Sequence, residues 1–300
     1  MSPGKKTALL CVYFLSSSSL LVLNKVAITA IPNASLLLMV QTSSTVILLV
    51  LPSFLCGARI DLKPSKRVVY AYVSVAFVFL ATIYSNFQVI HTIGVNPFVI
   101  LRCSTPLMVS ILDWAFLGRK LPNCNSLLAL LGIITGGFFY ANSKLAEPKV
   151  TDVSAATKWC LIWLFSFLLD MVYIKHVVQK FPCSNSERTV YQNSFAVPII
   201  MVLLLTDFDN LHIGDVGTIS TGTFLAVIST CLAGTALSYT GMSLRSELSA
   251  TAFTILGVVC KMASIFMNEV FIEPENNLFR LSCIVAVVIS SAMYRQAPLR

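Results

Sequence analysis

The stretch "AFTILGVVCKMASIFMNEVF", which runs from Ala252 to Phe271, decides the fold class because nearly all of it is apolar or small. As an α-helix, about 20 such residues are long enough to cross the hydrocarbon core of a bilayer. Lys261 lies in the middle of the stretch. A charged group at that depth is costly, so it must face a partner or a water-filled cavity. Lys261 is therefore a candidate functional residue.

The rest of the chain repeats this apolar pattern. Of its 300 residues, 56% are hydrophobic and 11% are charged, whereas about 25% are charged in soluble domains. Apolar runs predict ten spans, at 7–30, 34–56, 68–90, 95–117, 124–141, 156–174, 190–206, 221–241, 249–272 and 278–294. We therefore expect an all-α membrane protein with ten transmembrane helices. The first span lacks a small-residue cleavage site, so we interpret it as a retained helix.

The chain has a net charge of +8, and its basic residues are distributed as the predicted topology requires. If the N-terminus is cytosolic, fourteen Lys and Arg residues outside the span interiors fall on the cytosolic side, and four fall opposite: Lys144, Lys149, Lys158 and Arg280. This is the positive-inside bias, and it indicates that both termini are cytosolic. The basic charge then needs no nucleic-acid partner, and the partner that the composition indicates is the lipid bilayer.

The fourth and ninth spans match weakly at a shift of 155 residues. In that register Arg102 aligns with Gly257, and Lys261 aligns with Pro106. The two cations therefore lie one helical turn apart in the aligned helices. Each span also ends near an acidic residue. Many transporters consist of two halves related by symmetry, with the substrate between them. We therefore expect a five-plus-five inverted repeat, with residues 1–150 as the first half and 151–300 as the second.

Charged residues inside or at the edge of the spans are the strongest functional signal, and there are six: Lys25, Arg102, Asp113, Asp170, Lys261 and Glu269. Internal ion pairing is the favoured interpretation for the three acids. Lys25 has two interpretations, as a paired or snorkelling residue and as part of a substrate site. The deepest two, Arg102 and Lys261, indicate an anion site. Phosphate or carboxylate is the expected ligand group, because Arg binds it bidentately and Lys as a point charge.

A polar constellation begins the seventh span, in "ERTVYQNSFAVPII". Tyr191, Gln192, Asn193 and Ser194 combine an aromatic ring with hydrogen-bonding groups. Amides present both donors and acceptors, as a purine edge requires, and a tyrosine ring can stack on a base. A hydrated helix start is the alternative interpretation. In the eighth span, Ser238 adds a hydroxyl at depth, which by itself is typical of an interhelical hydrogen bond.

Catalytic and metal-binding signals are weak. The nine cysteines lack any CxxC spacing and lie mostly inside spans, and the three histidines are scattered. No metal cluster, nucleophile elbow or phosphate-binding loop is recognisable in the sequence. We therefore expect neither an enzyme nor a bound metal or cofactor.

Two motifs resemble those of the nucleotide-sugar transporters of the drug/metabolite transporter superfamily, especially the GDP-mannose and GDP-sugar carriers. "VYQNS" (190–194) resembles their FYNNN motif, and "GVVCK" (257–261) resembles their GALNK motif. Gln192 and Ser194 stand where that family has two asparagines, and Cys260 where it has another. "LVLNK", "YIKHVV" and "LSATAFTILG" extend the resemblance over most of the chain.

The resemblance implies an exchanger that brings a nucleotide sugar into the Golgi lumen and returns the nucleoside monophosphate. The resemblance implies that Tyr191, Asn193 and Ser194 contact the base and ribose, with Ser238 near the base. Gly257 would let the backbone approach the ligand, and Lys261 would meet the diphosphate or sugar. Phe253 stands where the fungal carriers tend to have a tyrosine that contacts the sugar, so one hydrogen bond is lost.

Several alternatives stay open at this level. A GDP-sugar such as GDP-mannose is favoured, but a UDP-sugar is not excluded, and neither is a triose-phosphate-like organophosphate exchanger. A membrane enzyme would need clustered acids or histidines, and a scaffold or receptor would not need deep cations. The sequence also leaves open a homodimer and the endoplasmic reticulum as the compartment.

Overall fold

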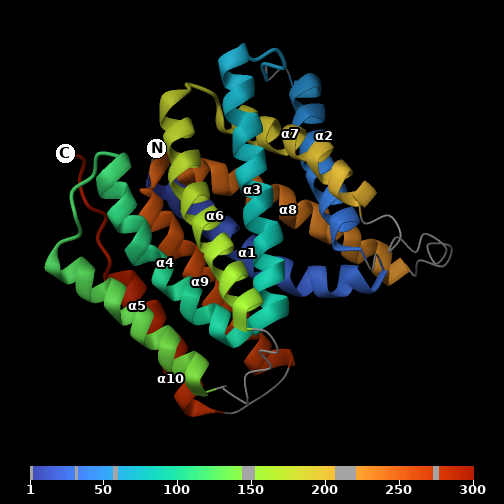
Figure 1. Cartoon of the computed structure of the whole chain (residues 1–300). Helices are drawn as coiled ribbons and strands as arrows, with labels where there is room; N and C mark the ends of the chain where they lie inside the picture. The colour runs from blue at the N-terminus through green and yellow to red at the C-terminus, as the bar shows by residue number, and fades with distance from the viewer. Residues whose placement is uncertain (1–2, 31–32, 57–59, 144–152, 207–220, 273–276) are drawn as a thin grey trace. The chain divides into compact units, whose positions relative to one another are not determined.

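The computed structural model describes residues 3–30, 33–56, 60–143, 153–206, 221–272 and 277–300. These residues form helices and no strand (Figure 1). The helices are α1 (Pro3–Ala30), α2 (Ala34–Cys56), α3 (Lys66–Ile93), α4 (Val95–Phe116), α5 (Cys124–Ser143), α6 (Val153–Lys180), α7 (Asn185–Thr206), α8 (Thr221–Glu247), α9 (Ala250–Met267), the π-helix η3 (Asn268–Ile272) and α10 (Leu278–Met293). The predicted all-α fold is confirmed.

Eight helices of the described residues, α2 to α9, are long and apolar enough to cross a membrane. The other two depart from the pattern for different reasons. α10 is apolar but has 16 residues, fewer than the about 20 that span a bilayer. α1 is long, but three lysines and the serine run Ser16–Ser19 lower its mean hydropathy. The helices therefore show a multi-span membrane protein, and the count of ten spans stays a prediction.

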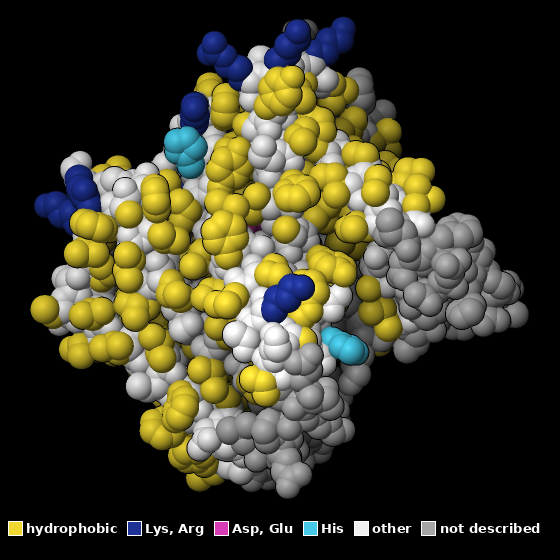
Figure 2. Space-filling model, in the orientation of Figure 1, with side chains coloured by type: hydrophobic (Ala, Val, Ile, Leu, Met, Phe, Trp, Pro, Cys, Tyr) yellow, Lys and Arg dark blue, Asp and Glu magenta, His cyan; other side chains and the backbone are white. Residues whose placement is uncertain are grey.

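The surface of the helices is apolar, as a bilayer requires. Large side chains such as Phe77, Phe116 and Phe165 are strongly exposed, and each belongs to a helix of membrane-spanning length. Figure 2 shows hydrophobic side chains over much of the visible face, with few Lys and Arg. A soluble monomer rarely exposes so much contiguous apolar surface. These faces are suited to contact lipid tails.

The chain divides into two compact units. The first unit consists of Met1–Leu80 and Val177–Ser246, and the second of Ala81–His176 and Glu247–Arg300. Each unit consists of one segment that begins in the first half of the sequence and one from the second half. The boundaries between the units fall inside α3 and α6. The predicted halves, 1–150 and 151–300, describe an internal repeat rather than these units, and that repeat stays a prediction.

Each unit has its own helix packing. In the first unit α2 packs on α7, and buried Ala76, Leu80, Ala196 and Ile200 form a core cluster. In the second unit α5 packs on both α4 and α10, and α9 packs on α4 and α10. The core of the second unit joins these four helices, with Val99, Ile133, Val258 and Val287 among its buried residues. This packing positions α4 and α9, the helices that carry the two deep cations.

Candidate functional site

The second unit brings the predicted cations Arg102 and Lys261 together. A Cβ atom built on Gly257 would lie 3.6 Å from the Arg102 guanidinium, so α9 passes close to that side chain. Lys261, one turn further along α9, interacts electrostatically with Arg102. Both side chains are half-buried. Two like charges held together at membrane depth repel each other, and an anion bound between them would remove that repulsion.

Arg102 lies over an aromatic side chain that was not among the predicted site residues. The centre of its guanidinium is 5.0 Å from the ring centroid of Phe167 on α6. Phe167 stacks on Trp163 at 5.2 Å, and Trp163 meets Phe98 edge-on at 4.8 Å. The ring quadrupole attracts the cation and fixes its place. The available signal was the spacing of Trp163 and Phe167, four residues apart on one helix face.

Phe253 lies on the same helix as the cation site. It is buried in α9, one turn before Gly257 and two turns before Lys261, and these spacings put all three on one face. Its ring has no hydrogen-bonding group. This face of α9 therefore offers apolar contact at one end and a cation at the other.

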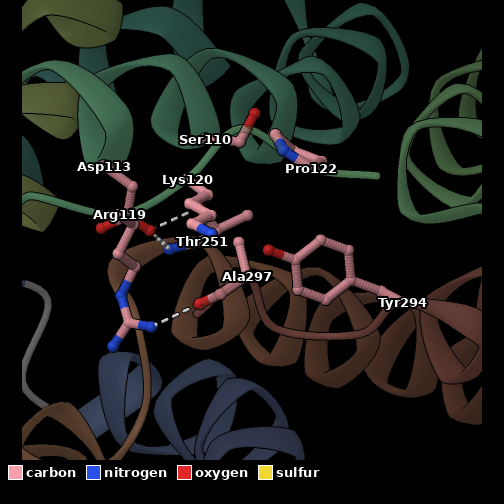
Figure 3. Close-up of a pocket in the computed structure, with 8 residues that line it drawn as sticks. All are labelled: Ser110, Asp113, Arg119, Lys120, Pro122, Thr251, Tyr294 and Ala297. Atoms are coloured by element: carbon pink, nitrogen blue, oxygen red, sulfur yellow. Dashed lines mark hydrogen bonds between the residues drawn. The ribbon is translucent and has the colours of Figure 1, made fainter. Parts of the chain in front are cut away.

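The structure shows hydrogen bonds to Asp113, for which ion pairing was the favoured interpretation from the sequence. Its carboxylate accepts bonds from the backbone N–H and the hydroxyl of Thr251, at 2.8 and 2.6 Å. Figure 3 shows this contact in a small pocket that Arg119 and Tyr294 also line. Arg119 donates to the Ala297 carbonyl at 2.7 Å. Among the described residues Asp113 thus connects the end of α4 to the first turn of α9.

Glu269 occupies the far end of the α9 segment, in η3. It is buried and accepts a hydrogen bond from the Tyr140 hydroxyl at 2.7 Å. Tyr140 belongs to α5, so the acid joins α5 to η3. A π-helical segment at the end of a transmembrane helix is a local irregularity of the kind that often marks functional sites.

The first unit brings together two of the residues expected to contact the base. The Asn193 amide on α7 donates to the Ser238 hydroxyl on α8 at 3.1 Å and to the Thr189 carbonyl at 2.8 Å. The neighbouring Gln192 is 6% exposed. Its amide oxygen has no hydrogen-bond partner among the described residues. A buried polar group left without a partner is destabilising, and a bound ligand or water would satisfy it.

Tyr191 is directed elsewhere in the first unit. Its hydroxyl donates to the Asp61 carbonyl, in the segment before α3, and its ring meets Tyr72 edge-on at 5.5 Å. Ser194 on α7 is half-buried. The backbone of Lys25 belongs to α1, but its side chain lies outside the described part of the chain. The structure thus joins Asn193 to Ser238, whereas the Tyr191 hydroxyl contacts the segment that precedes α3.

These features define a class: a multi-span α-helical membrane protein with polar and cationic clusters at the depth of its helices. No family model matches the chain. GDP-fucose transporter 1 of Arabidopsis thaliana is 28% identical, over 95% of this chain and 84% of its own length. The GDP-mannose transporter GONST3 of Arabidopsis thaliana is 26% identical, over 96% of this chain and 77% of its own. The resemblance to nucleotide-sugar transporters is confirmed by these relatives.

A comparison with solved structures supports the fold independently. One crystal structure superposes with a TM-score of 0.73 and covers 97% of this chain and 96% of the other. The two sequences are 11% identical, so this likeness concerns the fold alone.

Proposed function

We propose that this chain is a Golgi nucleotide-sugar transporter that exchanges a cytosolic GDP-sugar, such as GDP-mannose, for luminal GMP. The observation that carries the proposal is the cation pair of Arg102 and Lys261, set beside Gly257 at membrane depth. The two relatives, which match nearly the whole of this chain, are named as a GDP-fucose and a GDP-mannose transporter. Their names support GDP as the nucleotide.

In this proposal the substrate divides between two chemistries. Arg102 and Lys261 neutralise the diphosphate, because desolvated cations bind phosphate oxygens strongly. The amides of Gln192 and Asn193, with the Ser238 hydroxyl, present donors and acceptors to the base. The Gln192 amide oxygen, which has no hydrogen-bond partner in the described part of the chain, is available to the base. Phe253 contributes apolar contact, and Lys25, Tyr191 and Ser194 stay candidates for the remaining contacts.

The transport mechanism is alternating access by two halves of a ten-span inverted repeat, with both termini in the cytosol. The carrier with either ligand bound changes conformation readily, and the empty carrier does so slowly, because without a bound anion the like charges of Arg102 and Lys261 repel each other. Such a carrier exchanges one nucleotide ligand for another. A homodimer is compatible with this mechanism and is not required by it.

A UDP-sugar transporter is the second candidate. Gln192 and Ser194 differ from the asparagines of the motif that these carriers share. A longer amide and a hydroxyl change the hydrogen-bonding pattern offered to the base, while the cation pair is independent of the base.

Reconstituted liposomes test the function directly. Liposomes containing the purified chain are loaded with GMP or UMP, and uptake of labelled GDP-mannose, GDP-fucose and UDP-N-acetylglucosamine is measured. We expect GMP to drive uptake of a GDP-sugar, and we expect Lys261→Ala to lower it about tenfold or more, as the loss of one charge-assisted hydrogen bond implies. Lys158→Ala, which removes an exposed lysine at the start of α6, is the matched control.

The outcomes separate the candidates. Uptake driven only by UMP would replace GDP with UDP. Exchange of small organophosphates without any nucleotide-sugar uptake would favour a triose-phosphate-like carrier, in which Asn193→Ala should have no effect. Equal uptake by Lys261→Ala and Lys158→Ala would contradict the role of Lys261.

A further inference from the structure

A pair of amide side chains in the first unit has unused hydrogen-bonding capacity. The Gln41 amide on α2 donates to the Asn24 amide oxygen on α1 at 2.8 Å. An amide can make up to four hydrogen bonds. Among the described residues neither side chain makes any other hydrogen bond, and both are half-buried. The pair therefore retains donors on both residues and an acceptor on Gln41.

The depth of the pair decides what its exposed atoms can face. Gln41 follows the start of α2 by seven residues, and Asn24 precedes the end of α1 by six. At 1.5 Å per residue, each lies roughly 10 Å along its helix from that end. An amide turned toward lipid tails at that depth would lose its hydrogen bonds to water at a large cost. We therefore expect its accessible atoms to face water or a polar ligand rather than lipid.

α8 connects this pair to the base cluster, which consists of Asn193 and Ser238, the two joined residues that we expect to contact the base. A Cβ atom on Gly234 would lie 3.9 Å from the Cβ atom of Gln41, so α8 passes beside it. One residue on, the hydroxyls of Thr235 and Thr45 lie 3.2 Å apart. Ser238, the partner of Asn193, follows Gly234 by one turn, about 6 Å along the helix. Polar groups thus continue along one face of α8 from the base cluster to Gln41.

The chemistry of the pair selects a neutral ligand with adjacent hydroxyls. A hydroxyl both donates and accepts, so two of them fit a surface that offers both kinds of group. In a nucleotide the ribose is bonded to the base and carries two such hydroxyls. We propose that Asn24 and Gln41 form the ribose subsite of this carrier and bind the 2′- and 3′-hydroxyls. The inference rests on the proposed function and deepens it.

The test compares two ligands that differ by one hydroxyl. Binding of GMP and of 2′-deoxy-GMP is measured by competition against labelled GDP-mannose, for the wild-type chain, Gln41→Met and Asn24→Leu. We expect the wild type to bind GMP roughly three- to tenfold more tightly than 2′-deoxy-GMP, as one hydrogen bond implies. Both variants should lose that preference and bind 2′-deoxy-GMP as the wild type does.

Thr45→Val is the matched control, because Thr45 is 2% exposed, lies one turn after Gln41 on α2 and bonds to Thr235 on α8. It should keep the full preference for GMP.

The outcomes distinguish this inference from the proposed function. If the wild type binds neither nucleotide, the proposed function fails. If it binds both and the variants weaken them equally, or if neither amide variant gives a folded protein by thermal unfolding, the pair is structural and the inference is overturned. An unchanged preference in both variants would also overturn it.

Discussion

At the scale of single residues, Asp113 and Thr251 make a contact whose loss should destabilise the second unit. The Asp113 carboxylate accepts two hydrogen bonds from Thr251 in a buried place. Asp113→Ala leaves both donors without a partner, and we expect it to lower the free energy of unfolding by about 1.5–3 kcal/mol. Thr251→Ser keeps both bonds and should cost less than Thr251→Val, which removes one. Thermal unfolding in detergent measures the order, and equal losses for Ser and Val would contradict it.

The residue scale also shows what a sequence can predict of a site. Charges at depth are visible in the sequence because the bilayer makes them costly, and Arg102 and Lys261 do lie together. The partners of such groups are not visible. Thr251 is 138 positions away from Asp113, so no local pattern links them. The Tyr191 hydroxyl is 130 positions from its acceptor Asp61, which no motif announces.

At the scale of elements, glycine decides how closely α5 packs. A Cβ atom on Gly136 would lie 2.6 Å from a methyl carbon of Val287 on α10. We therefore expect Gly136→Ala to lower the melting temperature, because the two helices must separate or Val287 must shift. Val287→Ala removes that methyl group at the cost of a small cavity. The double variant should therefore lose less stability than the sum of the losses of the two single variants. Strict additivity, measured in a double-mutant cycle, would contradict this packing.

Helix ends mark the limit of predictions from hydropathy. The predicted span 190–206 becomes α7, which begins earlier, at Asn185. Ser184 and Glu187 form a capping box there: the Ser184 hydroxyl accepts from the Glu187 N–H at 3.2 Å, and the Glu187 carboxylate accepts from the Ser184 N–H at 2.7 Å. Apolar runs predict the part of a helix inside the membrane, whereas capping residues determine where it begins.

At the scale of the whole molecule, the helices follow from composition, but their grouping does not. Every predicted span from the second to the ninth overlaps a helix of spanning length. The compact units instead combine α1 and α2 with α7 and α8, and α4 and α5 with α9 and α10. Hydropathy is a property of each segment alone. Grouping depends on contacts between distant segments, such as the close approach of Gly137 on α5 to Cys103 on α4.

Orientation in the membrane is the property of the whole molecule that charge predicts, and native cysteines can test it. Cys124 begins α5 and Cys183 lies in the turn between α6 and α7, both on the side that we expect to be cytosolic. In sealed vesicles with the cytosolic face outward, a membrane-impermeant maleimide should label both. Leu278→Cys, an exposed position at the start of α10, should be labelled only after permeabilisation. Mass spectrometry identifies the labelled sites, and the reverse pattern would invert the topology.

The pH dependence of this labelling gives a second check on the same turn. Cys183 is half-buried, and burial raises the pKa of its thiol above the ordinary value, with the nearby Glu187 carboxylate acting in the same direction. Because only the thiolate reacts, the labelling rate of Cys183 near neutral pH should be low and should rise about tenfold per pH unit below that pKa. At pH 7 it should fall below the rate of the exposed Cys124. A Cys183 rate that is constant between pH 7 and 9 would mean that the thiol is already ionised, and that this turn is more open than the structure shows.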